Sequence, residues 1–364
     1  MVPLAAAEFR ALVEQYPDPY LRQTLGQAQA VEVAEWKGDR AHVRVALGFP
    51  VGDYQEEFAR ELSAFCASRG GPGRIQVELV SRITAHAVQR QLSPLGGVRN
   101  IVAVASGKGG VGKSTVAANL ALAWARQGAR VGILDADIYG PSQPIMLGLA
   151  GQHPTSPDDK TMNPLQAHGV AAMSIGLLID PEQPMAWRGP MVTQALNDLL
   201  TRTNWGELDY LVIDMPPGTG DIQLTLSQRV PVSGAVIVTT PQDIALADAR
   251  KGLKMFEKVN VPVLGVVENM SVHVCGNCGH VEHLFGAGGG ARMAAQYGVE
   301  LLGELPLDAR VREEADGGAP TVVAAPGSPH AAPYFMMARR TAAALARRAK
   351  DRSKLFPKIV VEES

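Results

Sequence analysis

The feature of this sequence that most restricts its fold is the segment GKGGVGKS at residues 107–114. The apolar run IVAVAS at 101–106 precedes it and reads as a buried strand, and STVAANLALAWARQG, which begins at Ser114, has the composition of a helix. The segment fits the pattern G-x-x-x-x-G-K-[ST], which forms a phosphate-binding loop when it lies between a strand and a helix. The sequence therefore predicts an α/β domain that binds a nucleotide.

Each residue type in this loop has a part in phosphate binding. Glycines let backbone amides point at phosphate oxygens, and the N-terminus of the following helix adds partial positive charge. We expect Lys113 to contact the β and γ phosphates and the Ser114 hydroxyl to ligate Mg²⁺. The nucleotide-binding residues expected from the loop are Gly107, Lys108, Gly109, Gly110, Val111, Gly112, Lys113, Ser114 and Thr115.

Polar side chains end three further apolar runs. Asp214 closes YLVID and precedes a turn rich in proline and glycine, Asp135 and Asp137 lie at the end of VGILDAD, and Asn269 closes VLGVVEN. Ligands of parallel sheets bind at the carboxyl ends of strands, where Asp214 can hold Mg²⁺ and an aspartate of the second run can orient the attacking water. An aspartate at a strand end can also serve only to cap a turn.

The pattern of apolar residues divides the chain into two domains. The first ninety residues alternate helical and strand periodicity, with helices expected at 5–14 and 56–68 and strands at 30–36, 41–47 and 74–80. The segment QLSPLGGVRN has the proline and paired glycines of a linker. The predicted organisation is a small α+β domain at 1–90, a linker at 91–99, a P-loop domain at 100–350 and a tail at 351–364.

The larger domain is predicted to be a mostly parallel sheet covered by helices on both faces. Nearly continuous apolar runs alternate with helix-length segments, which is typical of strands buried on both sides. The expected strands are 101–106, 131–136, 170–175, 210–214, 234–240 and 263–269, and the expected helices begin at Lys113 or lie near 191–201, 244–258 and 334–350. The last helix has arginines opposite an alanine-rich face, so we expect a solvated basic surface there.

Composition excludes several classes of function. The 364 residues are 46% hydrophobic, which suffices for a sizeable core, and the net charge of −2 gives no bulk attraction for nucleic acid or anionic lipid. No run of about 18 apolar residues is present, and the N-terminus does not have the pattern of a secretory signal. We expect a cytoplasmic protein with no membrane and no nucleic-acid partner.

Two of the three cysteines lie in the segment VCGNCGH, as Cys275 and Cys278, and three uses of this pair remain open. Two copies of the chain can pool their pairs around a [4Fe–4S] cluster on a two-fold axis. Alternatively, His280 and His283 can complete a local zinc site, or the pair can be a redox dithiol. Cys66 lies within a predicted helix of the small domain, where a buried, inert thiol is expected.

A second lysine makes the phosphate loop resemble one particular class. Lys108 directly follows the first glycine, and KGGVGKST resembles the deviant Walker A motif of ATPases that include MinD, ParA and the nitrogenase iron protein. This resemblance implies an ATP-dependent homodimer in which Lys108 reaches the nucleotide site of the partner. It also implies that Lys108, Lys113, Asp137 and Asp214 act in catalysis, that Asp137 orients the water, and that Asp135 supports the magnesium shell. The same resemblance assigns adenine contact to Asn269.

Several segments in order resemble the Mrp/ApbC group of ATP-binding iron–sulfur cluster carriers. They are VRNIVAVASGKGGVGKSTVAANLALA, ILDADIYGPSQPIMLG, WRGPMVTQAL, DYLVIDMPPGTGDIQLTL, VIVTTPQDIALADARKGLKMFEKVNVPVLGVVENMS and CGNCGH. The resemblance implies that Cys275 and Cys278 hold a [4Fe–4S] cluster bridged between subunits, with apo iron–sulfur proteins and cluster-assembly proteins as partners. The first ninety residues resemble a MIP18-like domain.

Two other readings of the loop and the cysteines also stay open. A positioning ATPase of the partition type would use the basic residues Arg339, Arg340, Arg347 and Arg348 to bind a surface when ATP is bound. An electron-transfer ATPase like the nitrogenase iron protein would keep a bridged cluster and pass electrons under ATP control. Both share the phosphate loop with the carrier, but only the electron-transfer reading also uses the cysteine pair.

Overall fold

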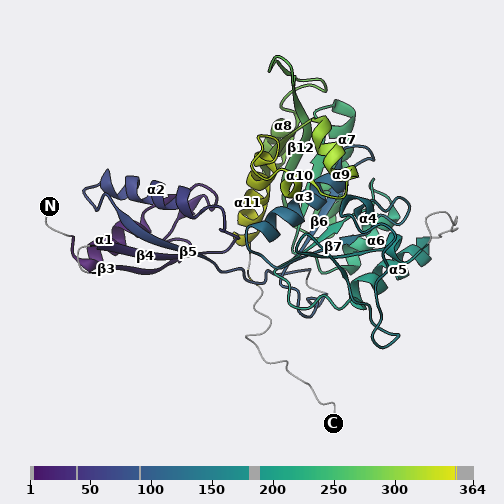
Figure 1. Ribbon diagram of the computed structural model, residues 1–364, viewed down its shortest axis with the longest axis horizontal. Helices are drawn as coiled ribbons and strands as arrows, with labels where there is room; N and C mark the ends of the chain where they lie inside the picture. The colour runs from purple at the N-terminus through teal and green to yellow at the C-terminus, as the bar shows by residue number, and fades with distance from the viewer. Residues whose placement is uncertain (1–3, 38–39, 90–91, 180–188, 349, 351–364) are drawn as a thin grey trace, which may run out of the picture.

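The computed structural model describes residues 4–37, 40–89, 92–179, 189–348 and 350. A small N-terminal body lies beside a larger α/β body in Figure 1, and the chain passes from one to the other after β5 (Ile75–Ser81). The expected tail at 351–364 lies outside the described residues, as do Trp187 and Arg188 of the motif WRGPMVTQAL.

The small body is the α+β region expected from the first ninety residues. Its elements are α1 (Ala6–Glu14), β1 (Pro17–Asp18), β2 (Gln23–Thr24), β3 (Val31–Lys37), β4 (Arg40–Leu47), α2 (Gln55–Ala67) and β5. Strand β4 is central, antiparallel to β3 and parallel to β5. Helix α2 buries Phe58, Leu62 and Cys66, which follow one another at four-residue spacing and so share one face. The Cys66 thiol is fully buried, and burial raises its pKa to about 11.

The large body is built on a nine-stranded sheet in the order β13-β12-β11-β6-β10-β7-β9-β8, with β14 also paired to β12. Its strands are β6 (Ile101–Ser106), β7 (Val131–Asp135), β8 (Leu165–Ala167), β9 (Val170–Ser174), β10 (Tyr210–Asp214), β11 (Gly234–Thr239), β12 (Val263–Val274), β13 (Val281–Glu282) and β14 (Glu300–Pro306). All pairings are parallel except those of β8 and β13. In this register Asp214 lies opposite Asp135. The carboxyl ends of the central strands therefore meet at one edge.

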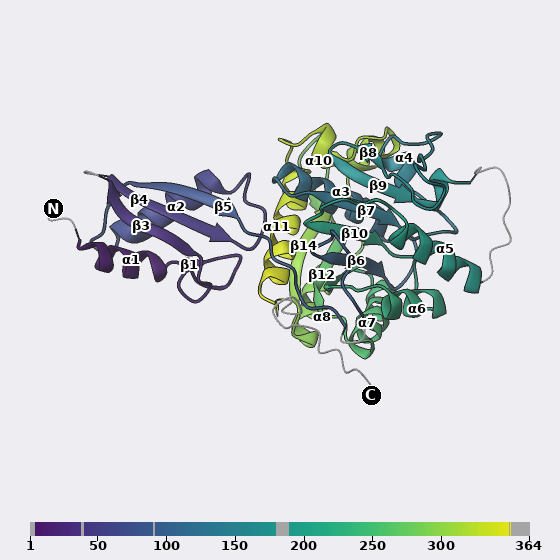
Figure 2. The same cartoon turned by 90° about the horizontal axis from the view of Figure 1, so that it is seen from below.

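Helices cover both faces of this sheet, as Figure 2 shows. They are α3 (Lys113–Arg126), α4 (Gln143–Met146), α5 (Gly189–Thr201), α6 (Asp221–Arg229), α7 (Asp243–Lys258), α8 (Gly289–Tyr297), α9 (Ala309–Asp316), α10 (Thr321–Ala324) and α11 (Ala332–Ala346). Helices α3 and α11 pack on one face, where Trp124 donates a hydrogen bond to the Ala338 carbonyl over 2.8 Å. Helices α5 to α8 bury a separate apolar core on the other face. No helix among the described residues is both long enough and apolar enough to span a bilayer.

The predicted fold class is confirmed, and the structure adds elements that were not predicted, among them α6, α8, β13 and β14. Strand β12 continues five residues beyond the predicted end at Asn269 and turns back through β13. Parallel strand β14 was not predicted, because its sequence ELLGELP carries two charges and becomes a strand only by pairing with β12. Helix α11 stops at Ala346, four residues before the predicted end.

The prediction of a solvated basic face on α11 is wrong. Arg339 is only 5% exposed and pairs with Asp53 at 2.9 Å and Glu57 at 3.4 Å. Its guanidinium also donates to the Tyr20 hydroxyl over 2.8 Å. Arg347 pairs with Glu300, and Arg348 donates to a backbone carbonyl of β12. Of the four arginines, only Arg340 is exposed without such a contact among the described residues, so this helix presents no basic stripe.

The Arg339 contact joins the small body to the large one, and its loss is expected to lower stability. Arg339→Ala should reduce the free energy of unfolding by about 2 kcal/mol, because it leaves Asp53 and Glu57 without their cation. Both carboxylates are partly hydrated, which keeps the loss below that of a fully buried ion pair. Urea unfolding followed by circular dichroism measures the change. Arg340→Ala is the matched control on the same helix, and its free energy of unfolding should lie within about 0.5 kcal/mol of the wild-type value. Equal stability of the two variants would show that the contact does not hold the bodies together.

Candidate functional site

The predicted phosphate loop connects the central strand β6 to the N-terminus of α3. Gly112 directly precedes the helix and has a φ of 79°, a left-handed conformation that glycine adopts without strain. The loop lines an open cavity of about 250 Å³. The cavity is bounded by Ser106, Lys108, Gly109, Gly110, Gly112, Lys113, Ser114, Thr115, Asp137, Gly140, Ser142, Met146 and Pro217. Most of the residues expected from the loop therefore surround one space beside a helix N-terminus.

Lys113 forms a buried ion pair at the floor of this site. Its side chain is 6% exposed, and its ammonium group pairs with the fully buried carboxylate of Asp214. The same group donates a hydrogen bond to Ser114 Oγ over 3.1 Å. The lysine, the serine and the aspartate, predicted from two separate motifs, thus lie in direct contact.

Gln143 is a residue of this site that sequence reasoning missed. Its side-chain amide donates to Asp214 Oδ2 over 2.9 Å and to the Ser114 carbonyl over 3.1 Å. Gln143 Oε1 is buried and has no hydrogen-bond partner among the described residues. The available signal was a polar residue in the loop that follows Asp135 and Asp137. Gln143 fixes the orientation of the Asp214 carboxylate from the side opposite Lys113.

Asp135 organises the loop that follows β7. One carboxylate oxygen accepts hydrogen bonds from the backbone amides of Ser142 and Gln143 at 3.0 and 3.1 Å and from the Ser174 hydroxyl at 3.2 Å. The other accepts from the Asp137 amide at 3.1 Å. Burial, followed by the nearby charge of Asp214, raises the pKa of Asp135 to about 7. Asp135 therefore already uses both oxygens to hold the chain around the site.

Asp137 and Lys108 face the cavity, whereas Asn269 lies behind the loop. Burial raises the pKa of Asp137, and its carboxylate accepts a hydrogen bond from the Gly140 amide at 3.3 Å. Lys108 is half-buried, and its carbonyl accepts from the Ser106 hydroxyl at 2.9 Å. The buried Asn269 donates its amide to the Val111 carbonyl over 2.9 Å. Asn269 thus supports the loop, and its contact with adenine stays a prediction.

The cysteine pair lies at the tip of a β-hairpin formed by β12 and β13. Val274 pairs with Val281, and the Cys275 amide donates to the His280 carbonyl over 2.9 Å. A return hydrogen bond runs from the Gly279 amide to the Cys275 carbonyl over 2.9 Å, and Gly279 has a φ of 71°. Cys278 is exposed and Cys275 is half-exposed. The hairpin therefore presents two thiols to the surroundings.

The turn also prepares Cys275 to act as a thiolate. Its pKa is lowered by hydrogen bonds to the sulfur from the backbone amides of Cys278 and Asn277, and then from the Cys278 thiol. Such contacts favour the charged form of the sulfur, which is the form that ligates metals.

The histidines beside the turn do not assemble a local zinc site. Among the described residues, no group of three or more cysteine, histidine or acidic side chains lies close enough to hold a metal ion. His283 directs its Nδ1 at the Ser271 carbonyl, 2.9 Å away. His280 lies 3.8 Å from a carboxylate oxygen of Glu282 and is exposed. The described chain thus offers two thiolate ligands without a third partner.

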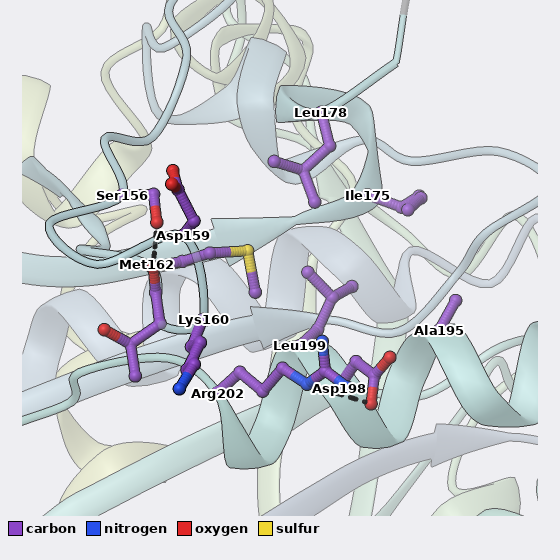
Figure 3. Close-up of a pocket in the computed structure, with 11 residues that line it drawn as sticks. Ser156, Asp159, Lys160, Met162, Ile175, Leu178, Ala195, Asp198, Leu199 and Arg202 are labelled. Atoms are coloured by element: carbon purple, nitrogen blue, oxygen red, sulfur yellow. Dashed lines mark hydrogen bonds and ion pairs between the residues drawn. The ribbon is translucent and has the colours of Figure 1, made fainter.

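A second cavity, of about 420 Å³, lies between α5 and the segment 156–162 (Figure 3). Its lining includes the apolar side chains Met162, Leu178 and Leu199, and two further lining residues, Arg202 and Asp198, form an ion pair at 3.5 Å. None of the predicted site residues lines this cavity. It is therefore separate from the nucleotide loop and the cysteine turn.

Comparison with known proteins supplies a family for the large body. Residues 97–342 match the family described as ParA: NUBPL iron-transfer P-loop NTPase. An iron–sulfur cluster carrier protein of Pseudomonas fragi is 64% identical over 269 residues, which are 74% of this chain and 94% of that protein. The iron–sulfur cluster carrier protein of Escherichia coli K12 is 52% identical over 330 residues, which are 91% of this chain and 89% of that protein.

A solved structure supports the same fold. The nucleotide-binding protein of Archaeoglobus fulgidus, in complex with ADP, has a TM-score of 0.55 and 42% sequence identity, and the alignment covers 61% of this chain and 87% of that one. Both the nucleotide loop and the cysteine turn lie within the residues that match the family.

Proposed function

The chain belongs to the Mrp/ApbC and NUBPL family of iron–sulfur cluster carrier proteins, which are P-loop NTPases like ParA and MinD, and from this premise we propose a finer function. In the cytoplasm it binds and hydrolyses ATP, holds a [4Fe–4S] cluster shared between two copies, and passes the cluster to apo-proteins. The observation that carries the proposal is the hairpin with one exposed and one half-exposed thiol and, among the described residues, no third ligand.

The cysteine turn fits one half of a cluster site. A [4Fe–4S] cluster is held by four thiolates, so two copies of Cys275 and Cys278 on a two-fold axis supply the complete set. The cluster is the cargo, and the lowered pKa of Cys275 favours its binding. Apolar side chains beside the turn are exposed, by 49% at Val274, 52% at Val281 and 56% at Leu284. A second copy of the hairpin would bury them, which supports dimerisation at this place.

The donor groups of the nucleotide site fit a magnesium nucleotide. The Ser114 hydroxyl and the Asp214 carboxylate would hold Mg²⁺, and the unpartnered oxygen of Gln143 lies on the residue that orients Asp214. Mg²⁺, when bound, neutralises charge on the phosphate oxygens. Asp135 supports this arrangement from behind, since both its oxygens already accept hydrogen bonds.

Two residues then act on the phosphates and the water. Lys113 exchanges its pairing with Asp214 for the β and γ phosphates, and Mg²⁺ held by Asp214 would then compensate the charge of that carboxylate. Asp137 faces the same cavity and accepts the hydrogen bond that orients the attacking water. Lys108, at the rim of the cavity, extends to the site of the partner copy.

A complementation experiment tests whether Lys108 acts across the dimer. Lys108→Ala and Lys113→Ala should each be inactive alone, but their mixture should recover about a quarter of the wild-type ATPase rate. Half of the randomly mixed dimers are heterodimers, and in each of these one site has both its own Lys113 and the partner's Lys108. The steady-state release of phosphate measures the recovery. A lysine acting within its own chain would leave the mixture as inactive as either variant.

A further inference from the structure

Strand β12 runs from the nucleotide loop to the cysteine turn without interruption. Asn269 bonds to the Val111 carbonyl of the loop, and Cys275 follows six positions later, after the strand ends at Val274. Six residues of extended chain span about 20 Å. Strand β12 thus contacts the nucleotide loop through Asn269 and carries the cysteine turn at its end.

This strand is irregular at the residue after Asn269. Met270 has a φ of 56°, a left-handed conformation that costs free energy for a side chain of this kind. The pairing of β12 with β14 shifts register between Glu268 and Val272, on either side of it. A bulge bends its strand and re-aims the side chains beyond it, so a change in its geometry would redirect the part of β12 that leads to the cysteine turn.

The bulge is in contact with the phosphate loop at Gly112. A β-carbon placed on Gly112 would lie 2.2 Å from the Asn269 amide nitrogen and 3.7 Å from the terminal carbon of Met270. Gly112 is the residue before Lys113, so a change of the loop on phosphate binding would reach Asn269 and Met270 through it. Asn269 and Met270, two of the three residues of the bulge at 269–271, therefore lie against the loop.

His283, on the returning arm of the hairpin, forms a hydrogen bond to the same bulge. It lies just after β13, and its Nδ1 is 2.9 Å from the carbonyl of Ser271, the residue after Met270. A carbonyl only accepts, so this contact requires Nδ1 to carry the proton. The returning arm of the cysteine hairpin is thus held by the residue next to the strained one.

We propose that the bulge at residues 269–271 links the nucleotide loop to the cysteine turn, and that Met270 and His283 are positioning residues for Cys275 and Cys278. A change at Gly112 alters the bulge, and the hairpin follows because His283 ties its return arm to Ser271. The proposal rests on the proposed function, since it assigns a route by which nucleotide controls the hold on the cluster.

The test uses the full chain without cluster and measures how fast iodoacetamide alkylates Cys275 and Cys278, by peptide mass spectrometry. In the wild type, MgADP or MgATP should change this rate about fivefold. Met270→Asn keeps a residue that tolerates the left-handed backbone but shortens the reach to Gly112, and His283→Ala removes the donor to Ser271. Both should lose the nucleotide effect while still binding nucleotide in a direct titration.

Matched variants distinguish the loss of this specific link from a general loss of folded structure. His283→Asn keeps a donor near the position of Nδ1 and should restore the nucleotide effect, and His280→Ala, on the same turn, should leave it unchanged. Met270→Gly permits the left-handed backbone, so it replaces Met270→Asn if that variant does not fold. The link is refuted if the folded Met270 and His283 variants respond to nucleotide as the wild type does.

The outcome is independent of whether the cluster proposal holds. A nucleotide-dependent alkylation rate in a chain that never binds iron would support the link and refute the cluster function. Cluster binding and ATP hydrolysis, with no effect of nucleotide on the alkylation rate, would support the cluster function and refute the link.

Discussion

Lys113→Ala is expected to lower ATP hydrolysis by at least about a hundredfold, because it removes the positive charge placed against the phosphates in the transition state. Cluster content after anaerobic reconstitution should stay close to that of the wild type, since the thiols lie on a separate hairpin. Phosphate release and iron analysis of the same preparation measure both effects. Loss of the cluster in this variant would show that nucleotide binding is needed to form the thiolate site.

The Lys113 variant needs a stability control, because the lysine also neutralises a buried carboxylate. Its removal leaves Asp214 unpaired beside Asp135 and should lower the free energy of unfolding by about 3 kcal/mol. Adding Asp214→Asn removes that buried charge and should recover part of the stability without recovering hydrolysis. Recovery of hydrolysis in the double variant would mean that Lys113 acts on Asp214 rather than on the phosphates.

Cys275→Ala or Cys278→Ala is expected to lower cluster content by more than about tenfold, because each substitution removes two of the four thiolates from a symmetric dimer. Iron and acid-labile sulfide analysis, with the visible absorption spectrum, measures the loss. ATP binding should persist, since neither cysteine contacts the phosphate loop in the described contacts.

Cys66→Ala is the matched control for these variants. This third cysteine is fully buried in α2 of the small body, and its pKa is raised by burial, so it is not available to a cluster. The Cys66 variant should keep its full iron content. Iron lost equally from all three variants would point to a general effect on folding, and iron retained without Cys275 would place the cluster elsewhere.

The central sheet and the phosphate loop could be predicted from the sequence because their signals are local. The runs at 101–106, 131–136 and 210–214 are apolar except for Ser106, Asp135 and Asp214 near their ends, as is typical of strands covered on both faces. Parallel strands end at a common edge, so an aspartate closing one run and a lysine following another were both assigned to one nucleotide site. The contact of Lys113 with Asp214 follows from that rule.

The parts that could not be predicted depend on contacts between distant segments. Nothing within VLGVVENMSVHV indicates that the strand passes through a left-handed Met270, because the bulge is fixed by pairing with β14, some thirty residues later. The periodicity of α11 shows an apolar face, but the burial of Arg339 depends on where the small body docks. Gln143 was missed because its role depends on two other loops.

The boundary between the two domains stays a proposal. The expected linker at 91–99 begins at a residue outside the described ranges, and its last residues already bond to the larger body, where the Arg99 amide donates to the Leu208 carbonyl over 2.9 Å. Before it, Gln89 donates to the Ser227 carbonyl over 2.9 Å. These contacts hold both ends of the segment that contains the proline and glycines against the larger body, so we do not describe it as a flexible linker.

The central claim is that two copies of one exposed hairpin share a cluster, and metal stoichiometry tests it most directly. The wild-type chain, reconstituted anaerobically, is analysed for iron, sulfide and zinc and weighed by native mass spectrometry. The account predicts a dimer with about two irons and two sulfides per chain, which is one [4Fe–4S] cluster for every two copies. One zinc per chain without sulfide, or four irons on a monomer, would contradict it.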